Sequence, residues 1–472
     1  MSIKSLGRQS LIYGVGHVLS RIVTFLLLPL YTHLFTPDEY GVISLAYAFM
    51  GMALIFYRYG MDSALLKYAI SFKDESRIVY LSTIYTMQVI TTIAFSAVIY
   101  LYSPILSIYI LSIEEPKLIM LLSGILACDA LWNLSILLLR AEEKPIQFVI
   151  FNLLNVLATM GLNIYFVVHL ERGIEGVLLA NLISSLLLLV LSFPVILKRL
   201  NLKKSSLSVA KKILKFGLPF LPAGIFTMIM ELANRYLLVM IDGSSSVGLY
   251  SAGHKIGMLG LIVVMGFNMG WTPYFLKRGQ QKHARNDFSI SATLFLGLLG
   301  FVVLTISLWV QELMQIKIGD ATLIGEQFWA AGEVVYLILL AYFFFGMYVI
   351  QLPGVYVKNK TKFIPWFRFV GAASNILFNV FLIPKYGVIG SAWATCIAYF
   401  LMTLMIYIYS NKIYPTNYNL MACFYPIMFF GMAFFLREGV LARTLLMFMY
   451  PLIWYVMIIN ENEKIILKSF IK

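Results

Sequence analysis

Charged residues are scarce in this chain. They make up 12% of its 472 residues, against about 25% in a typical soluble domain. Hydrophobic residues account for 61%, and the mean hydropathy is +0.86. These values exclude an ordinary soluble domain and predict an all-α polytopic membrane protein.

Cysteine is also rare. Cys128, Cys396 and Cys423 all fall in apolar runs, without the spacing of metal ligands. We therefore expect no metal site, no disulfide and no cofactor. The first apolar run, residues 11–35, is too long for the core of a signal peptide, so we expect it to remain as the first span.

Apolar runs of about 20 residues recur about fourteen times, which is the length that a membrane-spanning helix needs. The predicted spans are 11–35, 42–66, 79–108, 118–139, 146–168, 174–197, 213–241, 247–276, 288–310, 328–357, 363–383, 388–409, 420–436 and 440–459.

The net charge of +14 would suggest nucleic acid in a soluble protein, but most cations here fall in short loops on one predicted side. We therefore expect no nucleic-acid partner. The positive-inside rule instead places both termini of this multi-pass membrane protein in the cytoplasm. The predicted outer loops are short and leave no room for an external catalytic domain. This argues against a polysaccharide polymerase or ligase, and we expect no enzyme.

The two halves of the sequence resemble each other. Residues 39–47 match 246–254, pairing Gly41 with Gly248, and residues 173–181 match 387–395. Both matches lie six spans apart, so the repeats are parallel, although similarity by chance remains an alternative. We predict an N-terminal six-helix lobe (1–200), a C-terminal lobe that begins with a basic linker (201–412), and an accessory helix pair with the tail (413–472). In this plan the substrate lies between the lobes.

Four cations are predicted deep within spans, where each costs roughly 2.5–3.5 kcal/mol to insert. They are Arg21, Arg58, Arg235 and Lys255, and they belong to equivalent spans of the two halves. We interpret them as a cationic cavity for a phosphate or diphosphate. The alternative is that charges spaced i, i+4 pin helices together, as Arg58 with Asp62 or Glu231 with Arg235.

Other polar residues within spans suggest two further roles. His17, Asp62, Asp129 and Glu231 are candidates for proton or sodium coupling, because a buried carboxyl or imidazole can exchange a proton. Hydrogen-bonded structural roles remain open for Asp129 and His17. Glycan contacts are assigned to Asn152, Asn155, Asn163, Asn375 and Asn379, with hydrogen bonding between helices as the alternative.

An ordered set of segments resembles the polysaccharide transporters, the O-antigen and capsule repeat-unit flippases of the multidrug/oligosaccharidyl-lipid/polysaccharide superfamily. The segments are 30–41, Phe216-Gly-Leu-Pro-Phe-Leu-Pro222, Asn234-Arg-Tyr236, Val247-Gly-Leu-Tyr-Ser251, Trp271-Thr-Pro-Tyr-Phe275 and 379–390. The resemblance covers essentially the whole chain. One departure is Asn234, where relatives often carry Asp, and Glu231 is a possible substitute for that acid.

The resemblance implies fourteen helices and a flippase in the bacterial cell membrane. The substrate would be an undecaprenyl-diphosphate-linked oligosaccharide, a repeat unit of O-antigen, capsule or exopolysaccharide, moved to the outer leaflet by ion-coupled alternating access. Membrane lipids, a polysaccharide polymerase and a chain-length regulator are the expected partners of a monomer. The alternatives are a multidrug or cation antiporter of the same superfamily and a flippase for the lipid-linked peptidoglycan precursor.

Overall fold

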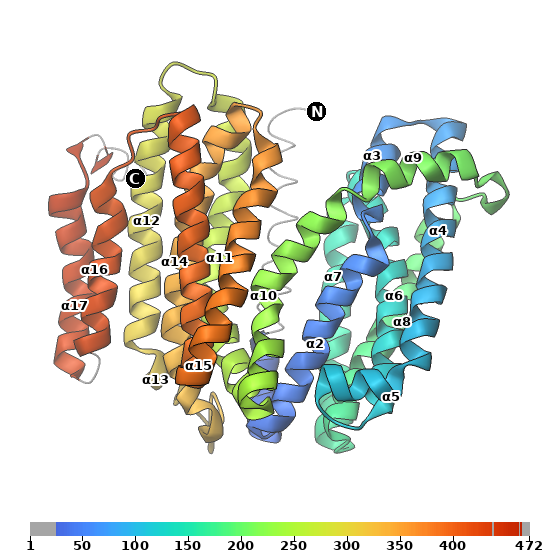
Figure 1. Ribbon diagram of the computed structural model, residues 1–472, viewed down its shortest axis with the longest axis horizontal. Coiled ribbons are helices and arrows are strands. Elements are labelled where there is room, and N and C mark those ends of the chain that lie inside the picture. Colours follow the sequence, from blue (N-terminus) through green and yellow to red (C-terminus); the bar gives the residue numbers. More distant parts are fainter. Residues whose placement is uncertain (1–24, 437–438, 462, 465–472) are drawn as a thin grey trace. The chain divides into compact units, whose positions relative to one another are not determined.

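A computed structural model describes residues 25–436, 439–461 and 463–464 (Figure 1). Apart from one short hairpin, the regular structure in this part of the chain is helical, which confirms the predicted class. Contacts divide the chain into two units, Met1–Gly248 and Leu249–Lys472. The predicted division into 1–200, 201–412 and 413–472 concerns functional lobes and stays a prediction.

The first unit contains, after the apolar helix Phe25–Leu34, nine α-helices and three short helices of other types within the described residues. They are α2 (Pro37–Arg58), α3 (Met61–Ser71), α4 (Asp74–Leu101), α5 (Ser103–Leu106), η1 (Ser107–Leu111), α6 (Pro116–Ala141), α7 (Pro145–Asn163), η2 (Ile164–His169), α8 (Gly173–Leu197), η3 (Leu202–Lys204), α9 (Leu207–Gly217) and α10 (Phe220–Asp242).

The second unit is built around α14 and α15, which pack along each other, with α12, α16 and α17 beside them. Its elements are α11 (Ser244–Arg278, whose first turn belongs to the first unit), α12 (Ala284–Leu308), α13 (Val310–Met314), β1 (Lys317–Ile318), β2 (Ala321–Thr322), η4 (Glu326–Ala331), α14 (Gly332–Val357), η5 (Thr361–Phe363), α15 (Ile364–Ile413), α16 (Leu420–Leu436), α17 (Val440–Ile453) and η6 (Trp454–Ile458). The two strands pair antiparallel.

Eleven helices among the described residues are long and apolar enough to cross a membrane. One of them, Thr361–Ile413, is interrupted at Gly387 (φ 52°, ψ −130°), and Phe25–Leu34 and Leu420–Leu436 are shorter apolar helices. The interruption falls between two predicted spans, 363–383 and 388–409. The count of fourteen and the cytoplasmic position of both termini stay predictions.

The second predicted span, 42–66, is not one helix. A capping box between Thr36 and Glu39 starts α2, and the helix ends at Arg58. Tyr59 (φ 28°) and Gly60 (φ 85°) then leave the helical region before α3 begins. The prediction of a continuous helix was wrong because Gly60 supplies a left-handed residue within an unbroken apolar run.

The break between α2 and α3 contacts a second break, which lies between α9 and α10. A Cβ atom on Gly60 would lie 2.0 Å from the carbonyl oxygen of Gly217, the last residue of α9, where the chain turns into α10. Two interrupted helices thus touch backbone to backbone at their interruptions. From there α10 packs along α2, which Figure 1 shows within the first unit.

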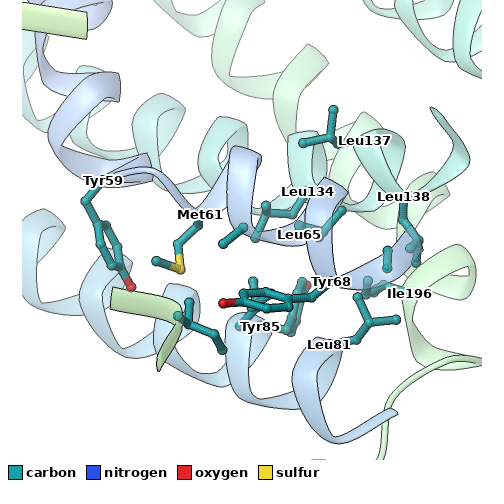
Figure 2. Packing of buried hydrophobic residues seen from close by; sticks show 14 residues of the cluster. Tyr59, Met61, Leu65, Tyr68, Leu81, Tyr85, Leu134, Leu137, Leu138 and Ile196 are labelled. Atoms are coloured by element: carbon teal, nitrogen blue, oxygen red, sulfur yellow. The ribbon is translucent and has the colours of Figure 1, made fainter. Parts of the chain in front are cut away.

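A buried apolar cluster holds α3 against α4, α6 and α8. Figure 2 shows Met61, Tyr68, Tyr85, Leu138 and Ile196 among its members. Because α3 is only 11 residues long, this packing rather than intrinsic propensity stabilises it. The cluster therefore fixes the short helix that follows the break.

Candidate functional site

The structure places one predicted ion pair at the break between α2 and α3. Nη1 of Arg58, the last residue of α2, lies 3.4 Å from Oδ2 of Asp62, in the first turn of α3. The pair therefore joins two helices rather than one face of a single helix. A cation at a helix C-terminus and an anion at a helix N-terminus are both favoured by the helix dipoles.

Arg58 keeps hydrogen-bonding capacity for a ligand. Its side chain is 28% exposed, and within the part of the chain that the structure describes its buried Nε has no hydrogen-bond partner. The same holds for Oδ1 of Asp62, whose side chain is 34% exposed. Unpaired donors at a half-buried guanidinium are costly unless a ligand or water completes them, so this position suits an anion.

Asp129 lies near this pair on α6. Its Oδ1 accepts hydrogen bonds from Trp132 Nε1 (2.8 Å) and from Ser185 Oγ on α8 (2.6 Å). Arg58 is close enough for its charge to attract the carboxylate. These two partners come from one helical turn away and from another helix. Asp129 thus belongs to the same polar group as Arg58.

Arg235 belongs to α10 and lies beside a different part of α2 than Arg58 occupies. Its Nη1 donates to the main-chain oxygen of Glu231 at 2.9 Å, and its charge acts on the hydroxyls of Tyr40 and Tyr236. The Tyr236 hydroxyl donates to the carbonyl of Leu45 at 3.4 Å, which places this part of α10 beside the first half of α2.

Arg58 and Arg235 are therefore well separated. Leu45 and Arg58 are thirteen positions apart in one helix, which at 1.5 Å per residue is about 20 Å. The structure does not bring these two cations together around one phosphate group. The shared cationic cavity, which also includes Arg21 and Lys255, stays a prediction.

Lys255 and its neighbour His254 belong to the second unit. His254 Nε2 lies 3.2 Å from the hydroxyl of Tyr342, and the ring of Tyr250 packs beside it. Lys255 is half-buried on α11. His17 and Arg21 lie outside the described residues, so their predicted roles stay predictions.

The five asparagines predicted to contact glycan have hydrogen-bond partners within the protein. Asn152 donates to the carbonyl of Phe148, and Asn155 Oδ1 accepts from Ser184. Asn163 accepts from the Tyr31 hydroxyl at 2.7 Å and is fully buried, while Asn379 donates to Asn375. The bonds of Asn155 and Asn163 join different helices and fit the alternative of hydrogen bonding between helices, whereas those of Asn152 and Asn379 stay within one helix. Glycan contact stays a prediction.

Two polar groups were not found from the sequence. One is a set of tyrosines near the start of α2, where Asn181 of α8 donates to the Tyr47 hydroxyl at 2.6 Å and Tyr40 lies near Arg235. The spacing of Tyr40 and Tyr47, two helical turns apart on one face, was the available signal. Tyr40 lies near the predicted cation Arg235, and Tyr47 lies near Tyr40, so the two hydroxyls extend the polar surroundings of the cation.

The other is a charge cluster centred on Glu142, just after α6. Its carboxylate contacts Arg199 (2.5 Å), Lys144 (2.9 Å) and Arg77 (3.0 Å). Burial alone would raise the pKa of Glu142, but the hydrogen bonds from these three cations outweigh burial and lower it to about 2. The cluster ties the ends of α4, α6 and α8 together.

A family model described as polysaccharide biosynthesis protein matches residues 6–278. The chain belongs to this family. The Lsg locus putative protein 1 of Haemophilus influenzae is 24% identical over 414 residues, covering 80% of this chain and 98% of that protein. An uncharacterized membrane protein of the same organism is 21% identical and covers 82% of this chain and 94% of its own length.

Solved structures share the fold. The lipid II flippase MurJ in an inward closed conformation superimposes with a TM-score of 0.73 at 16% identity, covering 98% of this chain and all of that one. An inward-facing multidrug resistance MATE family transporter of the MOP superfamily gives 0.60 at 15% identity, over 88% of this chain and 97% of that one. The membership in the polysaccharide biosynthesis family is confirmed, and the solved structures show that the chain shares its fold with transporters. This polysaccharide biosynthesis protein is a multi-pass bacterial membrane protein.

Proposed function

We propose that this family member is a flippase that moves an undecaprenyl-diphosphate-linked oligosaccharide from the cytoplasmic to the outer leaflet. The family match and the transporter folds support this class, and neither points to an enzyme. The observation that carries the proposal is Arg58, a half-buried guanidinium with an uncommitted Nε at the break between α2 and α3.

The separation of the cations suggests two successive binding positions. On the predicted topology Arg58 lies toward the cytoplasmic end of α2 and Arg235 toward the outer end, about 20 Å apart. We expect Arg58, beside Asp62 and Asp129, to receive the diphosphate, and Arg235 with its tyrosines to hold it before release. Lys255 and Arg21, which belong to the equivalent spans of the predicted repeat, are further candidates for binding the diphosphate.

Ion coupling is part of the proposal. Asp62 and Asp129 lie close to Arg58, so their charge changes how strongly the guanidinium binds an anion. Protonation of either carboxylate would strengthen diphosphate binding, which couples proton uptake to substrate uptake. Glu231 and His17 remain further coupling candidates, and sodium is the other possible ion.

The test is flipping of a lipid-linked oligosaccharide by the purified protein in liposomes. Arg58→Gln should reduce the flipping rate at least tenfold, because a charge-assisted hydrogen bond contributes about 1.5–3 kcal/mol. Arg58→Lys should recover part of it, since the charge remains but the planar fork is lost. Arg172→Gln, an exposed arginine paired with Glu175, serves as the matched control and should leave flipping unchanged.

Equal flipping by Arg58→Gln and the wild type would make this arginine structural. The fold shared with a lipid II flippase also supports a peptidoglycan precursor as substrate, which carries the same kind of anionic link. Competition between the two lipid-linked sugars in the same liposomes separates these functions. Transport of cationic drugs without lipid flipping would support the antiporter instead.

A further inference from the structure

A deep apolar groove in the second unit has no part in the proposed transport step. It has a volume of about 820 Å³, within the range of about 300–1,000 Å³ typical of ligand sites. It lies between α11, α12 and the last membrane helix, α17 with η6. Its walls include Trp271, Tyr274, Phe295, Leu298, Tyr450 and Trp454.

The walls of this groove are fixed by contacts of their own. Phe267 and Phe295 stack with centroids 3.8 Å apart, and Trp271 Nε1 donates to the carbonyl of Val349 on α14. The Tyr450 hydroxyl donates to the carbonyl of Gly297 at 3.1 Å, which anchors α17 to α12. The hollow is therefore preformed rather than a gap between loosely packed helices.

The groove is open because its lining is small in two places. Gly270 has no side chain, and a Cβ atom placed on it would meet nothing within 4 Å. Ser291 faces the groove from α12. Along α11 the lining runs from Phe267 to Arg278, which at 1.5 Å per residue is about 16 Å. That length equals about half of a hydrocarbon core of roughly 30 Å, or one leaflet.

One end of the groove is cationic. Arg278 lines it and pairs with Asp287 at 2.5 Å, and its side chain is still 46% exposed. Lys277, Lys282 and Arg285 are exposed nearby, so cations outnumber the single carboxylate. On the predicted topology this end lies at the cytoplasmic surface. An apolar slot one leaflet deep with a basic mouth has the chemistry of an anionic phospholipid.

We propose that this groove holds one acyl chain of an anionic phospholipid of the cytoplasmic leaflet, with its head group at Arg278 and the neighbouring cations. The head group then stays at the membrane surface. A resident lipid fits this geometry better than the transported substrate, whose diphosphate must leave the surface. The inference does not depend on which sugar the protein moves.

The test is native mass spectrometry of the full-length protein in detergent with added phosphatidylglycerol. The wild type should retain one such lipid. Gly270→Phe and Ser291→Phe fill the groove from opposite walls and should lower occupancy about tenfold, since loss of two buried methylene groups already corresponds to that factor. Gly266→Phe is the matched control, because Gly266 lies one turn earlier on α11, also has open space, and does not line the groove.

The head-group assignment is tested separately. Arg278→Gln should reduce the preference for phosphatidylglycerol over phosphatidylcholine about fivefold, as expected for one cation near an anionic lipid surface. Unchanged lipid occupancy in both groove-filling variants would overturn the proposal. So would displacement of phosphatidylglycerol by an equal amount of polyprenyl phosphate, which would make the groove a site for the substrate's tail.

Discussion

Gly60 is the position where one added methyl group should have the largest effect. Alanine there would adopt a positive φ, at a cost of about 1–2 kcal/mol, and its Cβ would lie 2.0 Å from the carbonyl oxygen of Gly217. The clashing atom is backbone, so it cannot rotate away, and overpacking typically costs a further 1–3 kcal/mol. We expect Gly60→Ala to lose about 2–5 kcal/mol of unfolding free energy.

Two other glycines separate these contributions. Gly173 has φ +55° but open space around its Cβ, so Gly173→Ala should lose only about 1–2 kcal/mol. Gly161 is helical with open space, and Gly161→Ala should gain about 0.5–1 kcal/mol.

The measurement is equilibrium unfolding of the four proteins, wild type included, in one detergent. If Gly60→Ala is no less stable than Gly173→Ala, the backbone contact between the two helix breaks is refuted.

The remaining predictions concern charge. Glu142→Gln should cost about 2 kcal/mol at neutral pH, because three cations lose their shared carboxylate. The pKa of Glu142 is lowered to about 2, so its contribution should be complete above about pH 4.5 and disappear as the pH falls from 4.5 to 2. The stability difference between wild type and Glu142→Gln, measured across that range, checks the sign, and a difference that grew on acidification would contradict it. Glu312→Gln should cost about 1–2 kcal/mol, since Glu312 lies 2.5 Å from the buried Arg443, but its carboxylate is 45% exposed and Arg443 keeps the carbonyl of Leu308 as a partner. Thermal unfolding beside Glu326→Gln, an exposed control, tests it, and equal stability of the two variants would count against this ion pair.

The sequence predicted the class of fold because twenty-residue apolar runs allow few alternatives. It also placed the boundary near Gly387 inside the long α15, where turn residues interrupt an apolar run. The break at Gly60 was missed because Tyr59, Gly60 and Met61 continue the apolar run, and hydrophobicity does not register a change of φ. Gly60, two positions after Arg58, was the only local signal.

The candidate site was predictable residue by residue but not as an arrangement. The free-energy cost of placing a charged side chain within the membrane identifies Arg58 and Asp129 as unusual. It does not show that Ser185 of another helix bonds to Asp129, or that Arg235 lies beside Leu45 rather than Arg58. Those relations depend on how α2 packs against α10 and on how α6 packs against α8, which no local pattern contains.

One long-range relation was nevertheless present in the sequence. The repeat paired Gly41 with Gly248, and the same offset pairs Pro37 with Ser244. In the structure a Cβ on Gly41 would lie 2.0 Å from the Ser244 oxygen, and one on Gly248 would lie 1.9 Å from the Pro37 oxygen. All four residues belong to the first unit.

The contact at this end of α2 is thus reciprocal. Each glycine packs on the residue that lies four positions before the other glycine. Two segments of the predicted parallel repeat would meet in this way if a two-fold axis related them, and the repeat itself stays a prediction. Small residues allow helices in lipid to approach closely. The close approach gives a physical reason for glycine at both positions, because a Cβ atom on either one would meet the backbone of the other segment.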